Sequence, residues 1–86
     1  MAEFAITFAR SARREIESLD AVILRRVLPK IEALAFSPRP HGCRKLQGEK
    51  QLWRIRVGDV RIVYALYDEE RRVDITAVRH RSKAYE

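Results

Sequence analysis

The order of hydrophobic and polar residues predicts a short strand and two helices in the first half of the chain. Residues 2–8 alternate as a strand with one buried face does, and the apolar side of that strand holds Phe4, Ile6 and Phe8. From residue 8 onward the apolar positions recur every three or four residues, at Phe8, Ala12, Ile16 and Leu19. This spacing is that of an amphipathic helix.

A second helix is predicted to begin after Asp20, because aspartate commonly caps the first turn of a helix. Its expected buried stripe consists of Leu24, Val27, Leu28, Ile31 and Leu34. Pro29 falls inside this stripe, where it removes a hydrogen bond and crowds the carbonyl of Arg25, at about 3 kcal/mol in a regular helix. We therefore expect a kink or an early break at Pro29, and an end of the helix at the SPRP segment, residues 37–40.

Residues 52–64, LWRIRVGDVRIVY, have the pattern of a β-hairpin turning at Gly58-Asp59. A two-residue turn fixes the register. The expected pairs are Val57 with Val60, Arg56 with Arg61, Ile55 with Ile62, and Arg54 with Val63. One face of the hairpin then carries Trp53, Ile55, Val57, Val60, Ile62 and Tyr64. The other face carries Arg54, Arg56 and Arg61.

A third strand of this sheet is expected at residues 72–78, after the charged turn at 68–71. Pairing Tyr67 with Arg72 places Ile62 opposite Ala77 and Arg61 opposite Val78, and it adds Asp74, Thr76 and Val78 to the face of the arginines. Residues 41–51 are interpreted as a polar, basic connection. The whole chain, 1–86, is expected to form one α+β domain: a strand, two helices and an antiparallel meander, with both helices on the apolar face. The arginine face is then left open.

Like charges directly opposite each other destabilise a sheet, so the arginine face needs an explanation. One interpretation is a solvated face whose charges prevent aggregation. The other is an anion site, because guanidinium groups bind phosphate oxygens in pairs and stay charged. The net charge of +6 favours a polyanionic partner. The basic C-terminal residues Arg79, His80, Arg81 and Lys83 are expected to reach the rim of this face, and His80 and Tyr85 are the nearby side chains able to move a proton.

Further features of the sequence bear on the location of the protein in the cell and on metal binding. No apolar run approaches the roughly 20 residues that span a bilayer, so no membrane association is expected. The N-terminus has too short an apolar stretch for a secretory signal, and the single cysteine, Cys43, fits a reducing cytosol. The protein is therefore expected to be cytoplasmic. His41 and Cys43 lack the further ligands that a metal site needs, and no metal or other cofactor is expected.

Three aromatic residues and one loop have two interpretations each. Trp53 has arginine neighbours that suit base stacking, but it shares the parity of Ile55 and is assigned to the core, as is Tyr64. Tyr67 lies on the arginine side at the far end of its strand, where it suits base stacking or is simply a partly exposed aromatic, and the second is favoured. The loop before the hairpin carries cations that suit either RNA phosphates or solvent, and RNA is favoured for Arg44, Lys45 and Lys50.

Over nearly its whole length the chain resembles the RelE/ParE superfamily of bacterial toxin–antitoxin toxins, closer to the RelE branch. The resemblance lies in the opening strand and two helices and in the segments SPRP, KLQG, LWRIRVGDVRIVY and VRHRSKAY. It implies a RelE-like fold and a toxin held inactive in a hetero-oligomer with a cognate antitoxin, the free toxin being monomeric. It also implies cleavage of mRNA in the ribosomal A site, without a metal, by attack of the RNA 2′-hydroxyl to leave a 2′,3′-cyclic phosphate.

The resemblance further implies roles for individual residues. Arg61 and Arg81 would hold and neutralise the scissile phosphate, and Tyr85 would act as general base or orient the 2′-hydroxyl, with His80 as a second candidate. Arg54 and Arg56 stand where RelE carries two lysines, and they would supply electrostatic stabilisation without proton transfer, since arginine does not readily lose a proton. Arg79, Lys83 and the loop cations would bind RNA. The alternative is a ParE-like protein that inhibits DNA gyrase without enzymatic activity.

Overall fold

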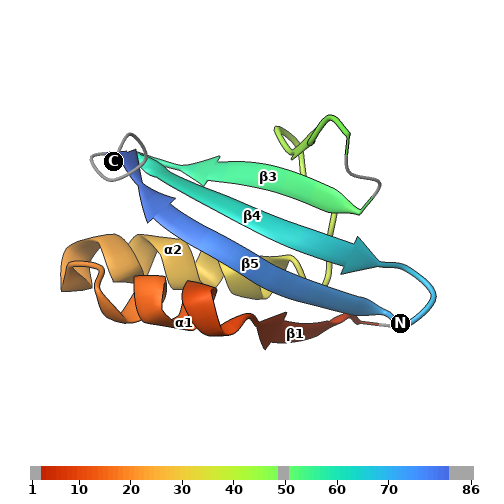
Figure 1. Cartoon of the computed structure of the whole chain (residues 1–86), viewed down its shortest axis with the longest axis horizontal. Helices are drawn as coiled ribbons and strands as arrows, with labels where there is room; N and C mark the ends of the chain where they lie inside the picture. Colours follow the sequence, from red (N-terminus) through yellow and green to blue (C-terminus); the bar gives the residue numbers. More distant parts are fainter. Residues whose placement is uncertain (1–2, 49–50, 82–86) are drawn as a thin grey trace.

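A five-stranded sheet carries both helices on one of its faces (Figure 1). The computed structural model describes residues 3–48 and 51–81. Its elements, in chain order, are β1 (Ala5–Phe8), α1 (Arg10–Glu17), α2 (Ala21–Ala33), β2 (Arg44–Lys45), β3 (Leu52–Val57), β4 (Val60–Tyr67) and β5 (Arg72–His80). The strand order is β1-β5-β4-β3-β2, with β1 parallel to β5 and the other neighbours antiparallel. The predicted α+β architecture, with the helices on one face, is confirmed.

The hydrophobic core lies between the helices and the sheet. Its fully buried side chains come from α1, α2 with its C-cap, β4 and β5, and include Ala12, Val27, Ile31, Leu34, Ile62, Tyr64, Val73, Ile75 and Val78. Trp53 is partly buried against this cluster, and the Tyr64 hydroxyl donates a hydrogen bond of 2.7 Å to the carbonyl of Pro38. The assignment of both aromatic residues to the apolar face is therefore confirmed. Each large side chain buried here contributes about 1.5–3 kcal/mol of transfer free energy.

The second helix begins as predicted and contains Pro29. The cap is as expected, since the Asp20 carboxylate accepts a hydrogen bond from the Val22 amide at 2.8 Å. Of the two expected effects of Pro29, a kink or an early break, the early break is wrong, because α2 continues past Pro29 to Ala33. Pro29 lies on the exposed side, where water can reach the carbonyl that loses its helical partner, while Val27 and Ile31 on the other side are buried. Burial of those side chains outweighs the local cost.

The expected connection at 41–51 contains a short strand that the sequence did not reveal. In β2, Arg44 pairs with Arg54 and Lys45 with Trp53, and the Leu46 amide donates to the carbonyl of Leu52 at 2.9 Å. Two charged residues have no apolar alternation to indicate a strand. The pairing depends on backbone hydrogen bonds to the edge of β3, which a side-chain pattern does not report.

The predicted strand register is correct for the β3–β4 hairpin and partly wrong for the β4–β5 hairpin. All four predicted pairs between β3 and β4 are confirmed. Between β4 and β5 the pairing holds from Tyr67–Arg72 to Tyr64–Ile75 and then shifts by one residue, so that Arg61 pairs with Arg79. The predicted pairs of Ile62 with Ala77 and Arg61 with Val78 are wrong. A β-bulge at Thr76 is the cause, because it adds one unpaired residue to β5 and so turns Val78 into the core and Arg79 to the open face.

Candidate anion-binding surface on the open sheet face

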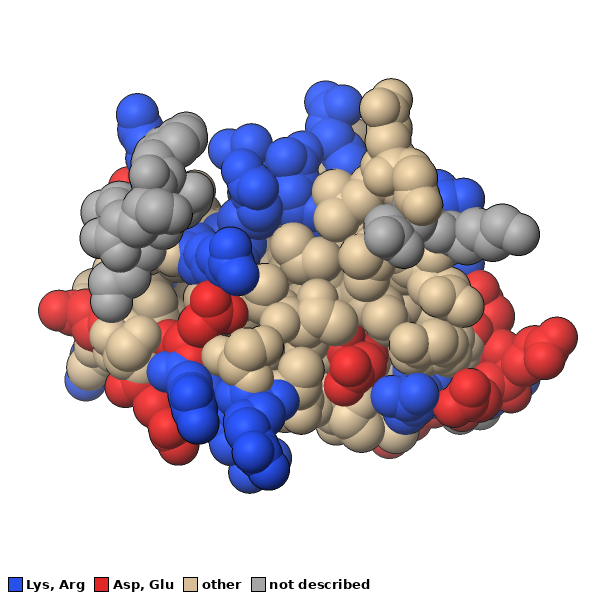
Figure 2. Space-filling model, in the orientation of Figure 1, with Lys and Arg blue, Asp and Glu red and all other residues tan. Residues whose placement is uncertain are grey.

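Arginines form two cross-strand groups on the sheet face that the helices leave uncovered. Arg44 of β2 pairs with Arg54 of β3, and Arg61 of β4 lies between Arg56 of β3 and Arg79 of β5. We call these five residues, with Arg81, the arginine surface. Figure 2 shows lysine and arginine side chains gathered at the top of the view, over β3. The bulge and β2 enlarge the cluster of three that the hairpin pattern predicted.

One hollow of the arginine surface lies beside the β3–β4 turn and has a volume of about 260 Å³. We call it the turn hollow; it is lined by Arg56, Gly58, Asp59, Val60, Arg61, Arg79 and Arg81. Gly58 has φ +59°, a left-handed conformation that glycine adopts without strain and that keeps the turn tight. The Arg81 amide donates to the Asp59 carbonyl at 2.7 Å, which ties the end of the last strand to the turn. Backbone contacts thus bring Arg81 to the same hollow as Arg61.

A second, more open hollow adjoins the first through Arg56. It has a volume of about 590 Å³ and is lined by His41, Gly42, Arg44, Arg54, Ile55 and Arg56. The short strand β2 places Arg44 here, directly opposite Arg54. The two hollows together give a continuous cationic path from β2 to the end of β5.

The arginines at the centre of this surface have no carboxylate partner in the described part of the chain. Among residues 3–48 and 51–81 the ion pairs made by arginine belong to Arg39, Arg72 and Arg79, and none involves Arg54, Arg56 or Arg61. Partial burial lowers the pKa of Arg54 from its ordinary value, and the positive charges of Arg56, Arg61 and Arg44 lower this pKa further. The cations therefore lie close enough to repel one another, as a site for an external anion requires.

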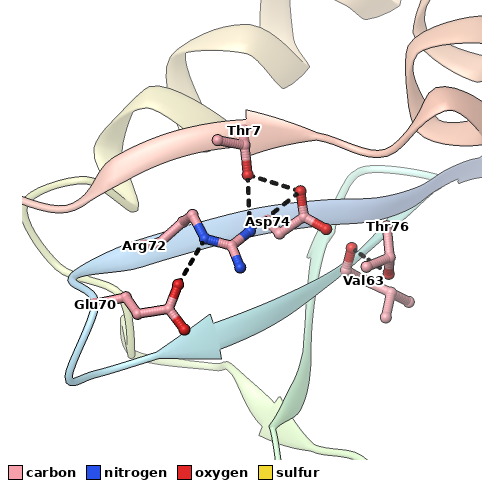
Figure 3. A network of polar contacts seen from close by, with 6 residues as sticks. All are labelled: Thr7, Val63, Glu70, Arg72, Asp74 and Thr76. Carbon is pink, nitrogen blue, oxygen red and sulfur yellow. Dashed lines mark hydrogen bonds and ion pairs between the residues drawn. The ribbon is translucent and has the colours of Figure 1, made fainter.

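At the opposite end of the same sheet face, carboxylates balance the charge of the arginine. There Arg72 donates to Glu70 at 3.3 Å and to the Thr7 hydroxyl at 3.4 Å, and lies 3.9 Å from Asp74 (Figure 3). Its guanidinium also stacks on the Tyr67 ring, 4.5 Å from the centroid. An arginine placed here for structural reasons has carboxylates around it, whereas the arginines at the centre of the arginine surface, on the same sheet face, have none among the described residues.

Comparison with known families identifies the chain. The family model for the ParE toxin of the type II toxin–antitoxin system parDE matches residues 6–85. This protein is a type II toxin of the RelE/ParE superfamily. Comparison with curated protein sequences finds no match.

Solved structures show that the toxin is RelE-like. The RelBE2 toxin–antitoxin complex of Mycobacterium tuberculosis has a chain with 28% sequence identity and a TM-score of 0.81, covering 92% of this toxin and 99% of that chain. The isolated Escherichia coli RelE toxin has 26% identity and a TM-score of 0.80, covering 95% of this toxin and 90% of that chain. The archaeal RelE–RelB complex from Pyrococcus horikoshii shares the fold, with 24% identity, a TM-score of 0.81 and coverage of 95% and 99%.

The structure of the toxin brings most of the predicted site residues together. Arg54, Arg56, Arg61, Arg79, Arg81 and Arg44 all line the two hollows. His80 does not join them, because it pairs with Val60, whose buried side chain lies on the helix side of the sheet. Lys45 is exposed but pairs with Trp53, on the face away from the arginines. Tyr85, Lys83 and Lys50 lie outside the described residues.

Two further observations bear on ligands and location. Within the described ranges, no three His, Cys, Asp or Glu side chains gather as a metal site would require. No helix in the described part of the chain is long and apolar enough to cross a membrane.

The sequence pattern missed one residue beside the site, Glu15 of α1, which bonds to Arg79. The available signal was that Glu15 directly follows Arg13 and Arg14 and is four residues from Ser11, on the same side of α1.

Proposed function

We propose that this toxin is a ribosome-dependent mRNA endonuclease that cleaves in the A site and so inhibits translation. The observation that carries the proposal is the group of Arg54, Arg56 and Arg61, crowded on rigid strands with no carboxylate partner among the described residues. Repulsion between these cations raises the free energy of the folded toxin, and an RNA phosphate in the turn hollow relieves it. The RelE-like fold over 95% of the chain supports the same assignment.

The proposed reaction is an internal transfer at one phosphodiester. The 2′-oxygen loses its proton and bonds to the adjacent phosphorus, the bond from phosphorus to the 5′-oxygen breaks, and a proton is delivered to that 5′-oxygen. The products are a 2′,3′-cyclic phosphate and a 5′-hydroxyl. Arg61 and Arg81 neutralise the charge that grows on the phosphoryl oxygens, and Arg54 and Arg56 add to this electrostatic stabilisation.

Proton transfer is proposed for Tyr85 or His80. Tyr85 lies outside the described residues. His80 is one residue from Arg81 along the chain, although its position in β5 places it on the helix side of the sheet. Replacing each by a side chain that cannot titrate, Tyr85→Phe and His80→Gln, separates the two assignments: the variant that loses the pH dependence of cleavage identifies the base.

Dependence on the ribosome follows from the shape of the site. The hollows are open toward solvent and do not enclose a nucleotide, so they can bind a phosphate without aligning the 2′-oxygen with the bond to be broken. Orientation of reacting groups accounts for a large part of many catalysed rates. We infer that ribosomal RNA supplies this orientation while the toxin supplies the cations.

We also propose that the toxin has a cognate antitoxin partner. Structurally similar chains were solved as complexes of RelE with RelB, including the one from Mycobacterium tuberculosis. An antitoxin with acidic residues over the arginine surface would neutralise it and exclude RNA. The expected assembly is a toxin–antitoxin hetero-oligomer.

The test is cleavage of mRNA on programmed ribosomes, mapped by primer extension, with naked RNA in parallel. The wild-type toxin should cut at the A site and leave naked RNA nearly intact. Arg61→Ala should lose at least about 100-fold in rate, whereas Arg25→Ala, a matched change at an exposed arginine of α2, should cut normally. Normal cleavage by Arg61→Ala would refute the assignment.

A second candidate function is inhibition of DNA gyrase without catalysis. It is favoured by the family model that matches residues 6–85, which describes a ParE toxin. A gyrase supercoiling assay separates the two functions. Inhibition of supercoiling with no RNA cleavage would establish the ParE-type activity in place of the nuclease.

A further inference from the structure

Beyond the end of β1, helix α1 contacts the outer edge of β5. The last contact of the β1 segment is the Ala9 amide donating to the Ile75 carbonyl at 2.8 Å. Beyond it, the Ser11 hydroxyl donates to the Thr76 carbonyl at 3.3 Å, and the Glu15 carboxylate accepts from the Val78 amide at 2.9 Å. Residues four apart lie on the same side of a helix. Two side chains of one helix face therefore continue the hydrogen bonding that a neighbouring strand provides elsewhere.

Glu15 also contacts the arginine surface itself. Its second carboxylate oxygen accepts a hydrogen bond from Nε of Arg79 at 3.0 Å. The Glu15 side chain is 27% exposed and that of Arg79 is 59% exposed, so the contact lies at the edge of the turn hollow. The two Nη groups of Arg79 make no hydrogen bond to the described residues and stay available for an external anion.

The bulge explains why this contact matters for the site. Val78 points into the core and Arg79 points to the open face because Thr76 adds one residue to β5. Glu15 bonds to both of these consecutive residues, one through its backbone and one through its side chain. Arg79 also faces Arg61 across the ladder, and their mutual repulsion would drive a long side chain toward solvent. The Glu15 carboxylate opposes that displacement.

We infer that Glu15 is a positioning residue for phosphate binding, which holds the Arg79 guanidinium over the turn hollow with its Nη groups directed at the ligand. The inference rests on the proposed function for the identity of the ligand, an RNA phosphodiester. A merely structural ion pair would contribute to stability alone. A positioning residue loses its effect when the residue it positions is removed.

Glu15→Gln separates the two contacts of this carboxylate. The amide keeps one oxygen that can accept from the Val78 amide, so β5 keeps its support, but it has no charge or second acceptor for Arg79. The matched control is Glu17→Gln, which makes the same change of charge at an exposed position of the same helix. Equal thermal midpoints for the two variants would show that the fold is retained.

The experiment is a double-mutant cycle with Glu15→Gln, Arg79→Ala and both together, using a 2′-O-methylated oligoribonucleotide that cannot be cleaved. In the wild-type background, Arg79→Ala should weaken binding by at least about fivefold. In the Glu15→Gln background it should weaken binding by less than about twofold. An equal or larger effect of Arg79→Ala in the Glu15→Gln background would overturn the inference, because Glu15 would then act independently of Arg79 or compete with RNA for it.

Cleavage on programmed ribosomes supplies the second readout. Glu15→Gln should lower the rate about tenfold, as displacement of one site group does, while Glu17→Gln cuts normally and the double variant matches Arg79→Ala. Cleavage by Glu15→Gln at the wild-type rate would also overturn the inference. If the wild-type toxin does not cut, the proposed function fails, and the binding cycle still decides the role of Glu15.

Discussion

Arg61 and Arg79 face each other across the β4–β5 ladder, and Arg56 faces Arg61 from the other side. Three cations in one row of a sheet raise the free energy of the folded state, because like charges in directly opposed positions repel. Of the three, Arg79 has a carboxylate partner among the described residues. The row is therefore a local cost to stability at the proposed site of function.

Replacing Arg61 by threonine should stabilise the fold while it removes activity. Relief of the repulsion and the strand preference of threonine together should add about 0.5 kcal/mol, or about 3 °C in thermal midpoint for a domain of this size. Thermal unfolding followed by circular dichroism measures the gain, which should shrink as salt screens the charges. A lower midpoint for Arg61→Thr than for wild type would contradict this account.

RNA binding should depend on salt through the central arginines. For single-stranded nucleic acid, each phosphate contact contributes about 0.7 to the slope of log affinity against log salt concentration. Arg54→Gln and Arg56→Gln should each reduce the slope by about this amount, and Arg25→Gln on the helix side should leave it unchanged. Fluorescence anisotropy with a 2′-O-methylated oligoribonucleotide measures the slopes. Equal slopes for all three variants would show that the arginine surface does not contact the RNA backbone.

Much of this surface was predictable from a single hairpin. Gly58-Asp59 sets a two-residue turn, and parity then places Arg54, Arg56 and Arg61 on one face without any tertiary information. The bulge at Thr76 was not predicted, because a regular ladder also gives an unbroken apolar face, with Ala77 in the core position that Val78 takes. The choice between them depends on side chains of α1, Ser11 among them, that bond to β5 from 65 residues away in the chain.

Acid should weaken the fold through the Arg39–Asp68 pair. The bidentate hydrogen bond from Arg39 holds the pKa of the Asp68 carboxyl below its usual value, at N–O distances of 3.1 and 2.7 Å. A carboxyl whose pKa is lower in the folded than in the unfolded state stabilises the fold above the unfolded value of about 3.9, and this contribution is lost as pH falls through the folded pKa.

Asp68→Asn should therefore reduce the loss of stability between neutral and acid pH. Urea midpoints at pH 7 and about pH 3 measure this difference for the variant and the wild type. The matched control is Glu69→Gln in the same turn, which makes no ion pair within the described part of the chain. An identical acid loss for Asp68→Asn and wild type would mean that the pair adds nothing to stability.

Tyr64→Phe should destabilise the toxin by about 1 kcal/mol. The Tyr64 side chain is fully buried, burial raises its pKa, and its hydroxyl is bonded to the Pro38 carbonyl. The phenylalanine ring keeps the packing and leaves that carbonyl without its donor, so the urea midpoint should fall while the site on the other face is unaffected. Unchanged RNA affinity with reduced stability is the expected combination; a loss of affinity would indicate that the SPRP segment supports the site.

The positions of Arg44 and Glu15 at the candidate site could not be predicted from the sequence, and the physical reason is the same for both. Arg44 reaches the surface through backbone pairing of β2 with β3, and Glu15 reaches it through packing of α1 on β5. Both contacts join segments that no periodicity connects. Arg79 was predicted near the rim, but its place opposite Arg61 required the bulge.

The parallel pairing of β1 with β5 joins the first strand of the chain to the last, and Thr7 and Asp74 seal it with a hydrogen bond of 2.7 Å (Figure 3). A growing polypeptide that still lacks β5 leaves β1 with no strand to pair with and lacks Arg79 and Arg81 altogether. Contacts between such distant segments form late in folding. The cationic surface is therefore complete only when β5 is in place, and a chain that lacks this strand has only part of the proposed anion site.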